Sequence, residues 1–298
     1  EGSINDRPLV SNLLAEHQPQ AIINVAAETH VDRSIDGPGP FVETNIQGTF
    51  QLLEACRDYV QSNKDHEGFR YLQVSTDEVF GSIESGQSVE TDPYRPNSPY
   101  AASKAAADHL VRSYFKTYGL ATMTTHGSNT YGPYQFPEKL LPLMVLNAVD
   151  GKQLPVYGDG TNERDWLYVD DHANGILAAL ENGIVGNAYN IGGGTELKNI
   201  DIVNLLCSIL DKLQPRKDGV PYADQITYVA DRPGHDQRYA LDCKKAKRDI
   251  GWSPEMDFTT GLEETIRWYL NHQEWCSKIA TSTYDRSRLG LDIGTKDH

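Results

Sequence analysis

The sequence predicts an α/β fold built on a doubly wound parallel sheet. Short apolar segments alternate with amphipathic helical segments through the first half of the chain, as in successive βαβ units. The segment from Ala21 to Ala26 is a short, mainly apolar run bounded by polar segments, which is typical of a buried parallel strand. With 298 residues, the chain is long enough for one large domain with a smaller one attached.

The elements of the first half are expected in a regular order. Asp6 is a suitable N-cap for a first helix, and Pro8 fits its first turn. Apolar residues that recur on one face between Phe41 and Val60 predict a second helix. The expected elements are a helix at 8–17, a strand at 21–26, a helix at 41–60, a strand at 70–74, a helix at 100–118 and a strand at 121–125.

The pattern becomes less regular after Gly132 and Pro133. Short strands are predicted near Leu154, Trp166, Ala188 and Ile226, and helices at 140–149, 170–181, 200–213 and 261–271. We expect this half to form a smaller lobe that is interleaved with the last strands of the main sheet. The sheet domain then comprises residues 1–137 with 166–191, and the lobe comprises residues 138–165 and 192–298.

The composition excludes several classes of partner. With 42 acidic and 27 basic residues, the net charge is -15, which repels nucleic acid and anionic membranes. No apolar run approaches the roughly 20 residues of a membrane span, and no signal peptide opens the sequence. Four cysteines lack both metal-ligand and disulfide spacing, so that we expect free thiols in a reducing cytoplasm and no metal site: Cys56, Cys207, Cys243 and Cys276.

The most informative residues are a Tyr/Lys pair and the strand end that it accompanies. Tyr100 and Lys104 are four residues apart on a predicted helix, so both project from one face. An ammonium group near a phenol lowers the pKa of the phenol from about 10, which would make Tyr100 a base near neutral pH. Ser75 and Thr76 end a buried strand, where open α/β sheets bind their ligands. Thr76 and Tyr100 are therefore expected to converge on one substrate hydroxyl.

Two acids, Asp77 and Glu78, follow Thr76 directly. Adjacent acids most often lie in a solvated loop. These two come immediately after a hydroxyl that we expect in the active site. Two neighbouring carboxyl groups in a partly buried pocket do not both ionise readily, so one stays protonated as the acid while the other serves as the base. A reaction that makes a ketone and then eliminates water needs this division.

Several motifs, spread in one order over essentially the whole chain, resemble those of the extended short-chain dehydrogenases that act on sugar nucleotides. More narrowly, they are similar to the dTDP-glucose 4,6-dehydratase family. The motifs are Ala26-Ala27-Glu28-Thr29-His30-Val31-Asp32-Arg33-Ser34, Ser75-Thr76-Asp77-Glu78-Val79-Phe80-Gly81, Tyr100-Ala101-Ala102-Ser103-Lys104, Gly127-Ser128-Asn129-Thr130-Tyr131-Gly132-Pro133-Tyr134-Gln135, Pro137-Glu138-Lys139-Leu140, Arg164-Asp165-Trp166 and Arg232-Pro233-Gly234-His235-Asp236.

The resemblance implies a Rossmann-like domain that binds NAD, and a role for each catalytic residue. Tyr100 takes the proton of the sugar 4-hydroxyl while hydride leaves C4 for NAD+, with Thr76 assisting and Lys104 holding the nicotinamide ribose. Glu78 then removes the C5 proton, Asp77 protonates the departing 6-hydroxyl, and the hydride returns to C6. The implied product is a 4-keto-6-deoxy sugar nucleotide, and the cofactor is regenerated in each turnover.

The resemblance also implies two sets of binding residues and a homodimer that forms through the helices at 41–60 and 100–118. Arg164 and Arg232 are chemically suited to a diphosphate inside an acidic protein. The residues that would approach the cofactor are Ser3, Ile4, Ala26, Ala27, Thr29, Thr44, Tyr100 and Lys104. Those that would line the sugar-nucleotide site are Thr29, Thr76, Asn129, Lys139, Leu140, Pro155, Tyr157, Arg164, Asn199, Arg232, His235 and Tyr284.

The sequence departs from the family pattern in three places. No glycine-rich turn of the kind that receives a pyrophosphate precedes the first helix, and the chain does not begin with Met. We therefore expect about the first one and a half to two βα units of such a fold to be missing. Ser3 stands where the family usually has Asp, and Thr130 replaces its usual second Asn.

Two alternatives stay open at this point. The first is another sugar-nucleotide enzyme of the same fold, such as a UDP-glucose 4,6-dehydratase, a 4-epimerase or a decarboxylase. The second is a catalytically silent nucleotide-binding protein or fragment. The choice between thymine and uracil as the base of the nucleotide also stays open.

Overall fold

The centre of the molecule is a four-stranded parallel sheet. The computed structural model describes residues 2–62 and 68–282. In spatial order the strands are β1 (Ala21–Asn24), β2 (Arg70–Thr76), β3 (Thr122–Gly127) and β7 (Ala188–Ile191). β2 pairs with β3 up to its last residue, where Thr76 lies opposite Gly127. The carboxyl end of β2 is therefore held in register at one edge of the sheet.

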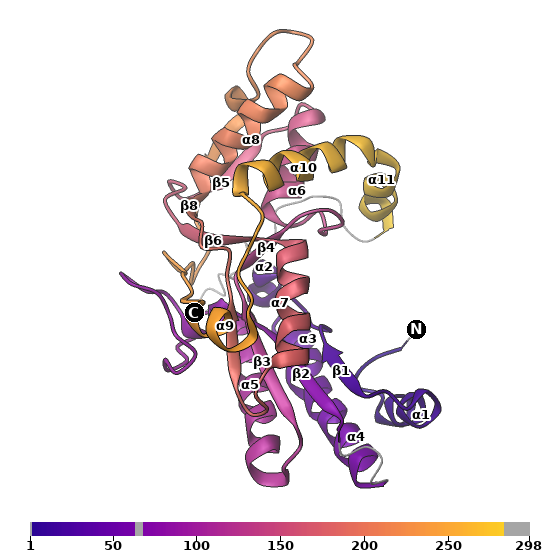
Figure 1. Cartoon of the computed structure of the whole chain (residues 1–298). Helices are drawn as coiled ribbons and strands as arrows, with labels where there is room; N and C mark the ends of the chain where they lie inside the picture. The colour runs from indigo at the N-terminus through magenta and orange to yellow at the C-terminus, as the bar shows by residue number, and fades with distance from the viewer. Residues whose placement is uncertain (1, 63–67, 283–298) are drawn as a thin grey trace, which may run out of the picture.

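Helices cover both faces of this sheet (Figure 1). One layer contains α1 (Arg7–His17), α4 (Thr49–Ser62) and α5 (Pro99–Tyr118), and the other contains α7 (Val169–Asn182) and α9 (Lys244–Ile250). The side chains of β2 alternate between the two faces of the sheet. Tyr71 packs against the first helix layer, whereas Leu72 and Val74 pack against the second. This arrangement confirms the predicted doubly wound α/β class.

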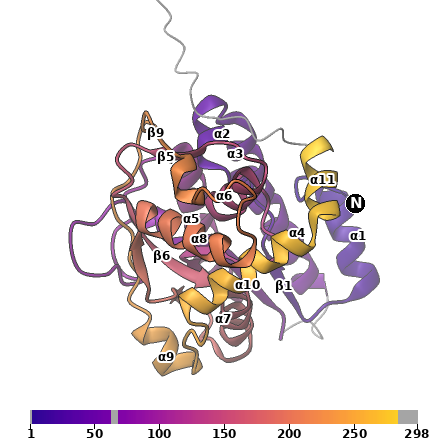
Figure 2. The ribbon, with the colours of Figure 1, turned by 90° about the horizontal axis from the view of Figure 1, so that it is seen from above.

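A smaller lobe stands above the sheet in Figure 1 and is seen from above in Figure 2. Its apolar core lies among helices that bury Met144, Leu206 and Leu262. The helices of the lobe are α6 (Leu140–Val149), α8 (Asn199–Leu213), the 3-10 turn η4 (Tyr222–Gln225), α10 (Phe258–Asn271) and α11 (Gln273–Ser282). Its strands are β4 (Asn129–Tyr131), β5 (Leu154–Tyr157), β6 (Glu163–Tyr168), β8 (Glu196–Lys198) and β9 (Ile226–Val229).

The lobe is interleaved with the main sheet along the chain. β6 pairs with β4 and β8, and β5 pairs with β9, whereas β7 returns to the main sheet between them. None of the helices in residues 2–62 and 68–282 has the length and apolar character that crossing a membrane requires.

Local differences from the predicted elements concentrate near the sheet edge. The predicted helix at 41–60 begins as a single turn, α3 (Gly39–Phe41), and continues as the π-helical segment η1 (Val42–Gly48) before α4. The strand predicted at 21–26 ends at Asn24, and α2 (Val31–Asp36) is absent from the prediction. The N-cap at Asp6 is confirmed, because its Oδ1 accepts a hydrogen bond from Leu9 N at 3.0 Å.

Candidate active site

The end of β2 and the start of α5 bring the predicted catalytic residues together. Thr76 closes β2, and its Oγ1 accepts a hydrogen bond from Glu78 N at 3.3 Å, which caps the short 3-10 helix η3 (Asp77–Phe80). This turn folds the two acids back against the sheet edge instead of extending the strand. At the start of α5, Ser98 Oγ accepts from Ala101 N at 3.0 Å. Tyr100 thereby comes close enough to Thr76 for the Thr76 hydroxyl to lower the pKa of the phenol, while Thr76 Oγ1 donates to Asp77 Oδ1 at 3.2 Å.

Asp77 and Glu78 lie in different electrostatic surroundings although they are neighbours. Asp77 is 3% exposed, and burial, Glu78 and Asp165 raise its pKa well above the usual range. Burial also raises the pKa of Glu78, but Arg232, Arg164 and Lys139 oppose that rise. Asp77 is therefore the carboxyl group that more readily keeps its proton, and Glu78 is the one that more readily ionises.

Lys104 does not make Tyr100 acidic in the way that the sequence suggests. The pKa of Tyr100 is raised by its burial and by Glu78, and only the hydroxyl of Thr76 lowers it. Lys104 Nζ donates to the carbonyl oxygen of Val74 at 2.7 Å, and burial lowers the pKa of this ammonium group. Without cofactor or substrate, the loss of water and the negative field of Glu78 therefore act against the phenolate, and the role of Tyr100 as the base stays a prediction.

A cavity of about 240 Å³ opens between the sheet edge and the smaller lobe. Apart from Thr76 and Tyr284, all residues that were predicted for the sugar-nucleotide site line it, together with Glu78. The lining residues from that set are Thr29, Asn129, Lys139, Leu140, Pro155, Tyr157, Arg164, Asn199, Arg232 and His235. Thr76 is not among the lining residues, but it is hydrogen bonded to the backbone of Glu78, which is one of them. Tyr284 lies outside the described residues.

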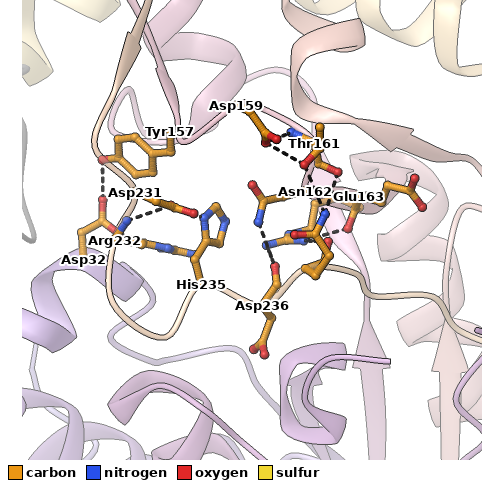
Figure 3. Close-up of polar contacts among 12 residues, drawn as sticks. Asp32, Tyr157, Asp159, Thr161, Asn162, Glu163, Asp231, Arg232, His235 and Asp236 are labelled. Carbon is orange, nitrogen blue, oxygen red and sulfur yellow. Dashed lines mark hydrogen bonds and ion pairs between the residues drawn. The ribbon is translucent and has the colours of Figure 1, made fainter. Parts of the chain in front are cut away.

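Arg232 is held in the cavity by an acid from the opposite domain. Asp32 Oδ1 accepts from Arg232 Nη1 at 2.6 Å, and Asp32 Oδ2 accepts from the Tyr157 hydroxyl at 2.8 Å (Figure 3). Asp32 is 5% exposed, and Arg232 together with Tyr157 lowers its pKa against the effect of burial. This bridge joins α2 to the loop that follows β9 and to the end of β5, so it spans the cavity between the two parts of the molecule.

His235 stands next to this bridge in Figure 3. Its Nδ1 lies 2.6 Å from Asp231 Oδ1, and burial with the neighbouring Arg232 and Arg164 lowers its pKa to about 4. His235 is therefore neutral at pH 7 and contributes hydrogen bonding, not charge, to the cavity.

The other two cations of the cavity are held by backbone carbonyl groups. Arg164 donates to the carbonyl oxygens of Glu163 at 2.7 Å and of Asp236 at 2.8 Å, and its guanidinium lies 4.5 Å from the ring centroid of Tyr239. Lys139 Nζ donates to Thr29 O at 2.7 Å. These carbonyl contacts leave the charges of Lys139 and Arg164 in place, whereas Asp32 offsets the charge of Arg232. Three cations (Lys139, Arg164 and Arg232) and three acids (Asp32, Glu78 and Glu138) thus line the same cavity.

The carboxyl end of β1 provides the surface on which the cofactor residues were predicted. Ala26 is exposed, Ala27 is partly exposed, and the preceding Val25 leaves 64% of its surface uncovered. Thr44 lies in η1, where Asn45 Nδ2 donates to Ser103 Oγ at 2.8 Å and so ties this π-helical segment to α5. Ser3 is exposed at the chain start, and Ile4 packs over Gly48.

These residues fit the nicotinamide half of NAD. Small and apolar residues leave an open apolar wall. Lys104 uses one of its three ammonium hydrogens in the bond to Val74 O, which leaves donors for ribose hydroxyls. A π-helical segment such as η1 is also frequent at functional sites. The residues that would meet the pyrophosphate in a glycine-rich turn are not among these 298.

Sequence reasoning missed several residues of the cavity. The most polar of them are His30, Asp32, Glu138, Asn147 and Tyr239. Asp32 and Glu138 lie inside the quoted motifs. Asp32 pairs with Arg232 at 2.6 Å, and Glu138 pairs with Arg33 at 2.9 Å. The excess of acids near predicted cations could have suggested both pairs. Tyr239 carried no such signal, because its place beside Arg164 depends on the path of the loop after β9.

Comparisons with known proteins agree with this geometry. A family model described as GDP-mannose 4,6 dehydratase matches residues 1–265. The dTDP-glucose 4,6-dehydratase of Xanthomonas campestris pv. campestris is 52% identical over 296 residues, which cover 98% of this chain and 84% of that protein. In Escherichia coli K12, dTDP-glucose 4,6-dehydratase 1 is 49% identical, with 94% of this chain and 81% of that protein covered.

Solved structures give the same result. DesIV, a dTDP-glucose 4,6-dehydratase from Streptomyces venezuelae that was crystallised with NAD and TYD, superposes with a TM-score of 0.85 at 46% identity, covering 93% of this chain and 81% of that one. The UDP-glucose 4-epimerase of Thermus thermophilus, solved with NAD, superposes with a TM-score of 0.80 at 28% identity, covering 91% and 84%.

The molecule combines a doubly wound sheet, a Tyr/Lys pair at the sheet edge, and a cavity with three cations under a second lobe. These features define an extended short-chain dehydrogenase that acts on sugar nucleotides. Within that class, the identity of about half of all residues over nearly the whole chain is decisive. The chain belongs to the dTDP-glucose 4,6-dehydratase family.

Proposed function

We propose that the protein converts dTDP-glucose into dTDP-4-keto-6-deoxy-glucose and water, as an NAD-dependent hydro-lyase. The observation that carries this proposal is the pair Asp77 and Glu78, whose carboxyl groups share one turn at the cavity but differ in their electrostatic surroundings. The rival 4-epimerases and decarboxylases use the Tyr/Lys pair but do not need both acids. The relatives at about half identity are dehydratases, and the epimerase structures are more distant.

The oxidation begins at the sugar 4-hydroxyl. Tyr100 takes its proton, and Thr76, close to Tyr100, orients the hydroxyl or passes the proton on. A bound NAD+ would supply the hydride chemistry that links C4 and C6. Lys104 holds the ribose beside Tyr100.

The elimination uses the two acids in different protonation states. The 4-ketone acidifies the C5 hydrogen, and the Glu78 carboxylate removes it, supported by the fields of Arg232, Arg164 and Lys139. Asp77 remains protonated because of its burial and its acidic neighbours, and it gives its proton to the 6-hydroxyl, which leaves as water. Glu78 then returns a proton to C5 as C6 is reduced.

The cationic wall of the cavity is proposed to bind the diphosphate. Arg232 and Lys139 present charge to the cavity, and Tyr157, Pro155, Leu140, Asn129, Asn199 and His235 surround it. Thymine is proposed as the base on the strength of the relatives' names alone. We further propose a homodimer in the cytoplasm; the free thiols of Cys56, Cys207 and Cys243 agree with a reducing compartment.

The division into a cofactor domain (1–137 with 166–191) and a sugar-nucleotide lobe (138–165 and 192–298) is proposed as well. The separate apolar cores support it, one among the helices of the lobe and two on the faces of the main sheet. β6 and α9 are exceptions. β6 supplies Arg164 to the cavity at its first half and packs Leu167 against the sheet domain at its second, and α9 falls within 192–298 but packs Ala246 and Ile250 on the main sheet.

The proposed function is tested with Glu78→Gln. This variant keeps Tyr100, Thr76 and Lys104, so some oxidation at C4 should remain, whereas exchange of the C5 hydrogen with solvent should stop. The measurement is deuterium incorporation from heavy water into recovered substrate and product, read by mass spectrometry or NMR. Product formed at the rate of the unchanged protein would contradict the dehydratase assignment.

A further inference from the structure

A cluster of buried polar side chains lies beneath Lys104 and takes no part in the scheme above. Its members come from β2, the loop before α5, α5 itself, β3 and β7: Ser75, Tyr94, Asp108, His126 and Asn190. Ser75 is 6% exposed, Asp108 is 4% exposed, and both His126 and Asn190 are 0% exposed. Buried polar groups are stable when they are hydrogen bonded, and such networks fix the positions of their members.

Asp108 is the centre of this cluster. Its Oδ2 accepts from Ser75 Oγ at 2.6 Å and from the Tyr94 hydroxyl at 3.3 Å, and it lies 3.6 Å from His126 Nε2. Its Oδ1 is buried and has no hydrogen-bond partner. One oxygen of the carboxyl group is thus anchored from three elements, while the other is left for an electrostatic interaction.

Lys104 stands one helical turn before Asp108. Residues four apart on a helix lie on one face, with Cβ atoms about 5–6 Å apart. Lys104 is 4% exposed, and its Nζ donates to Val74 O at 2.7 Å, so the ammonium group is confined between β2 and α5 on the side where Asp108 is anchored.

We propose that Asp108 is a positioning residue for the Tyr100/Lys104 pair: it is the counter-ion that keeps buried Lys104 in its ammonium form, and the cluster holds its carboxylate at the required place. This inference rests on the proposed function only in that Tyr100 and Lys104 form the base of the reaction. The charge relation between Lys104 and Asp108 stands without it.

The electrostatics agree with the geometry. Burial lowers the pKa of Lys104, and Asp108 is the charged group that raises it. The groups that face Asp108 are Lys104 and Tyr100 on α5, Ser75 and Tyr71 on β2, His126 on β3 and Tyr94 in the preceding loop. Asp108 and Tyr94 also line a second cavity of about 430 Å³, whose other titratable or charged residues are Glu90, Asp92, His109, Arg112 and Lys245. Within this set, Asp108 is the acid nearest in the chain to Lys104.

The far end of the cluster fixes the protonation of His126. Asn190 Nδ2 donates to Ser88 O at 2.8 Å, which turns Asn190 Oδ1 toward His126 Nδ1 at 3.1 Å. Nδ1 therefore carries a proton. When His126 is neutral, Nε2 accepts from the Tyr94 hydroxyl at 2.7 Å; when it is charged, Nε2 donates, and the Tyr94 hydroxyl turns to Asp108. Either state leaves Ser75 bonded to Asp108.

The test is a titration of Lys104 in Asp108→Asn. The side-chain ε-carbon resonance of Lys104, assigned by comparison with Lys104→Met, reports its protonation without substrate or cofactor. We expect the apparent pKa of Lys104 to fall by about one unit or more, a tenfold or larger change in its proton affinity. Asp171→Asn is the matched control: Asp171 is also buried, but it accepts from the backbone of Glu255 and Met256 and is not part of the cluster. That variant should leave the titration of Lys104 unchanged.

Turnover gives a second readout. Since Lys104 must stay charged, kcat falls as the pH rises through its pKa, and Asp108→Asn should shift that alkaline limb to lower pH by the same amount. In a Lys104→Met background, Asp108→Asn should cause no further shift of the alkaline limb of kcat. There it should instead lower the pKa of Tyr100, because the direct field of Asp108 raises it. A failure of the proposed function would remove the turnover result and leave the titration intact.

Three results would overturn the proposal. The first is an unchanged or raised pKa of Lys104 in Asp108→Asn, and the second is an equal change in Asp171→Asn. The third is that the effects of Asp108→Asn and Lys104→Met on kcat add fully in the double variant. Ser75→Ala covers the case in which Asp108→Asn does not fold. It keeps the carboxylate and removes its shortest hydrogen bond, and it should shift the pKa of Lys104 in the same direction by a smaller amount. No shift in Ser75→Ala would show that the cluster does not position Asp108.

Discussion

The edge of the main sheet and the wall of the smaller lobe shift the pKa values of their buried acidic groups in opposite directions. At the sheet edge, Asp77 and Tyr100 are buried among acids, and their pKa values are raised, so both groups tend to hold protons. Across the cavity, Asp32 is equally buried but pairs with Arg232, and its pKa is lowered. The first region keeps groups neutral so that they can transfer protons, and the second keeps groups charged so that they can bind an anion.

Glu78 is the point where the two regions meet. It extends from the sheet edge into the cavity, and the cations of the lobe act on it directly. The lobe therefore has a second effect beyond binding, since it sets which of two adjacent acids is the base. Variants of each region should separate these contributions.

The largest effect is expected at the sheet edge, from Asp77→Asn. The amide cannot protonate the departing 6-hydroxyl, and loss of a general acid costs about 10²–10⁴-fold in kcat. KM should change little, because asparagine keeps the size of Asp77 and removes only its acidic proton. Steady-state kinetics with dTDP-glucose measure both constants, and reduced cofactor should accumulate, since C4 is still oxidised.

Asp171→Asn serves as the control for a buried Asp→Asn change outside the site, and it should keep kcat within about twofold. If Asp77→Asn raised KM while kcat stayed constant, the sheet edge would be a binding surface, and its contrast with the lobe would be lost.

The difference between the regions also decided what the sequence could predict. At the sheet edge, residues sit at the ends of regular elements, so the alternation of strand and helix was enough to place Thr76 and Tyr100 side by side. The 3-10 turn η3 was not predictable from periodicity, because it depends on a single capping hydrogen bond, which Glu78 N donates to Thr76 Oγ1. The π-helical segment η1 was also missed, since an amphipathic pattern does not distinguish it from the α-helix that it interrupts.

In the lobe, only the resemblance to a family named the residues. Arg164 stands on a strand that is distant in sequence from Arg232 and His235, and these two share a loop whose course no local pattern specifies. Asp32, their partner from the opposite domain, was missed as a cavity residue for the same reason: a contact over 200 positions of sequence leaves no periodic signal. The burial that raises the pKa of Tyr100 was likewise not predictable before the fold was known.

An intermediate effect is expected in the lobe, from Arg232→Gln. A hydrogen bond to a charged group contributes about 1.5–3 kcal/mol, so the affinity for dTDP should fall by about 10–100-fold, whereas thymidine should bind as before. Calorimetry with the two ligands measures this difference. The matched control is Arg33→Gln, which removes an arginine that pairs with Glu138 at 2.9 Å and does not line the cavity.

The same variant should also change the pH dependence of kcat. Arg232 lowers the pKa of Glu78, so its removal raises that pKa. The base must be ionised, and activity is lost as the pH falls through the pKa of Glu78; in Arg232→Gln this loss should therefore begin at a higher pH. A weaker affinity for dTDP with an unmoved acid limb would show that the lobe binds the substrate without tuning the base.

The smallest effect is expected from Tyr157→Phe, which removes one hydrogen bond from the bridge between the regions and leaves the ion pair of Asp32 with Arg232. We expect a loss of about 0.5–1.5 kcal/mol in the free energy of unfolding and a change of less than about threefold in kcat. The loss should be seen above the unfolded pKa of Asp32 and should shrink as the pH falls through its lowered folded pKa, because protonated Asp32 no longer holds the bridge. Denaturant unfolding at neutral and acidic pH measures both values. Since the hydroxyl spans the two regions, a loss that did not depend on pH would place its stabilising contact elsewhere than on Asp32.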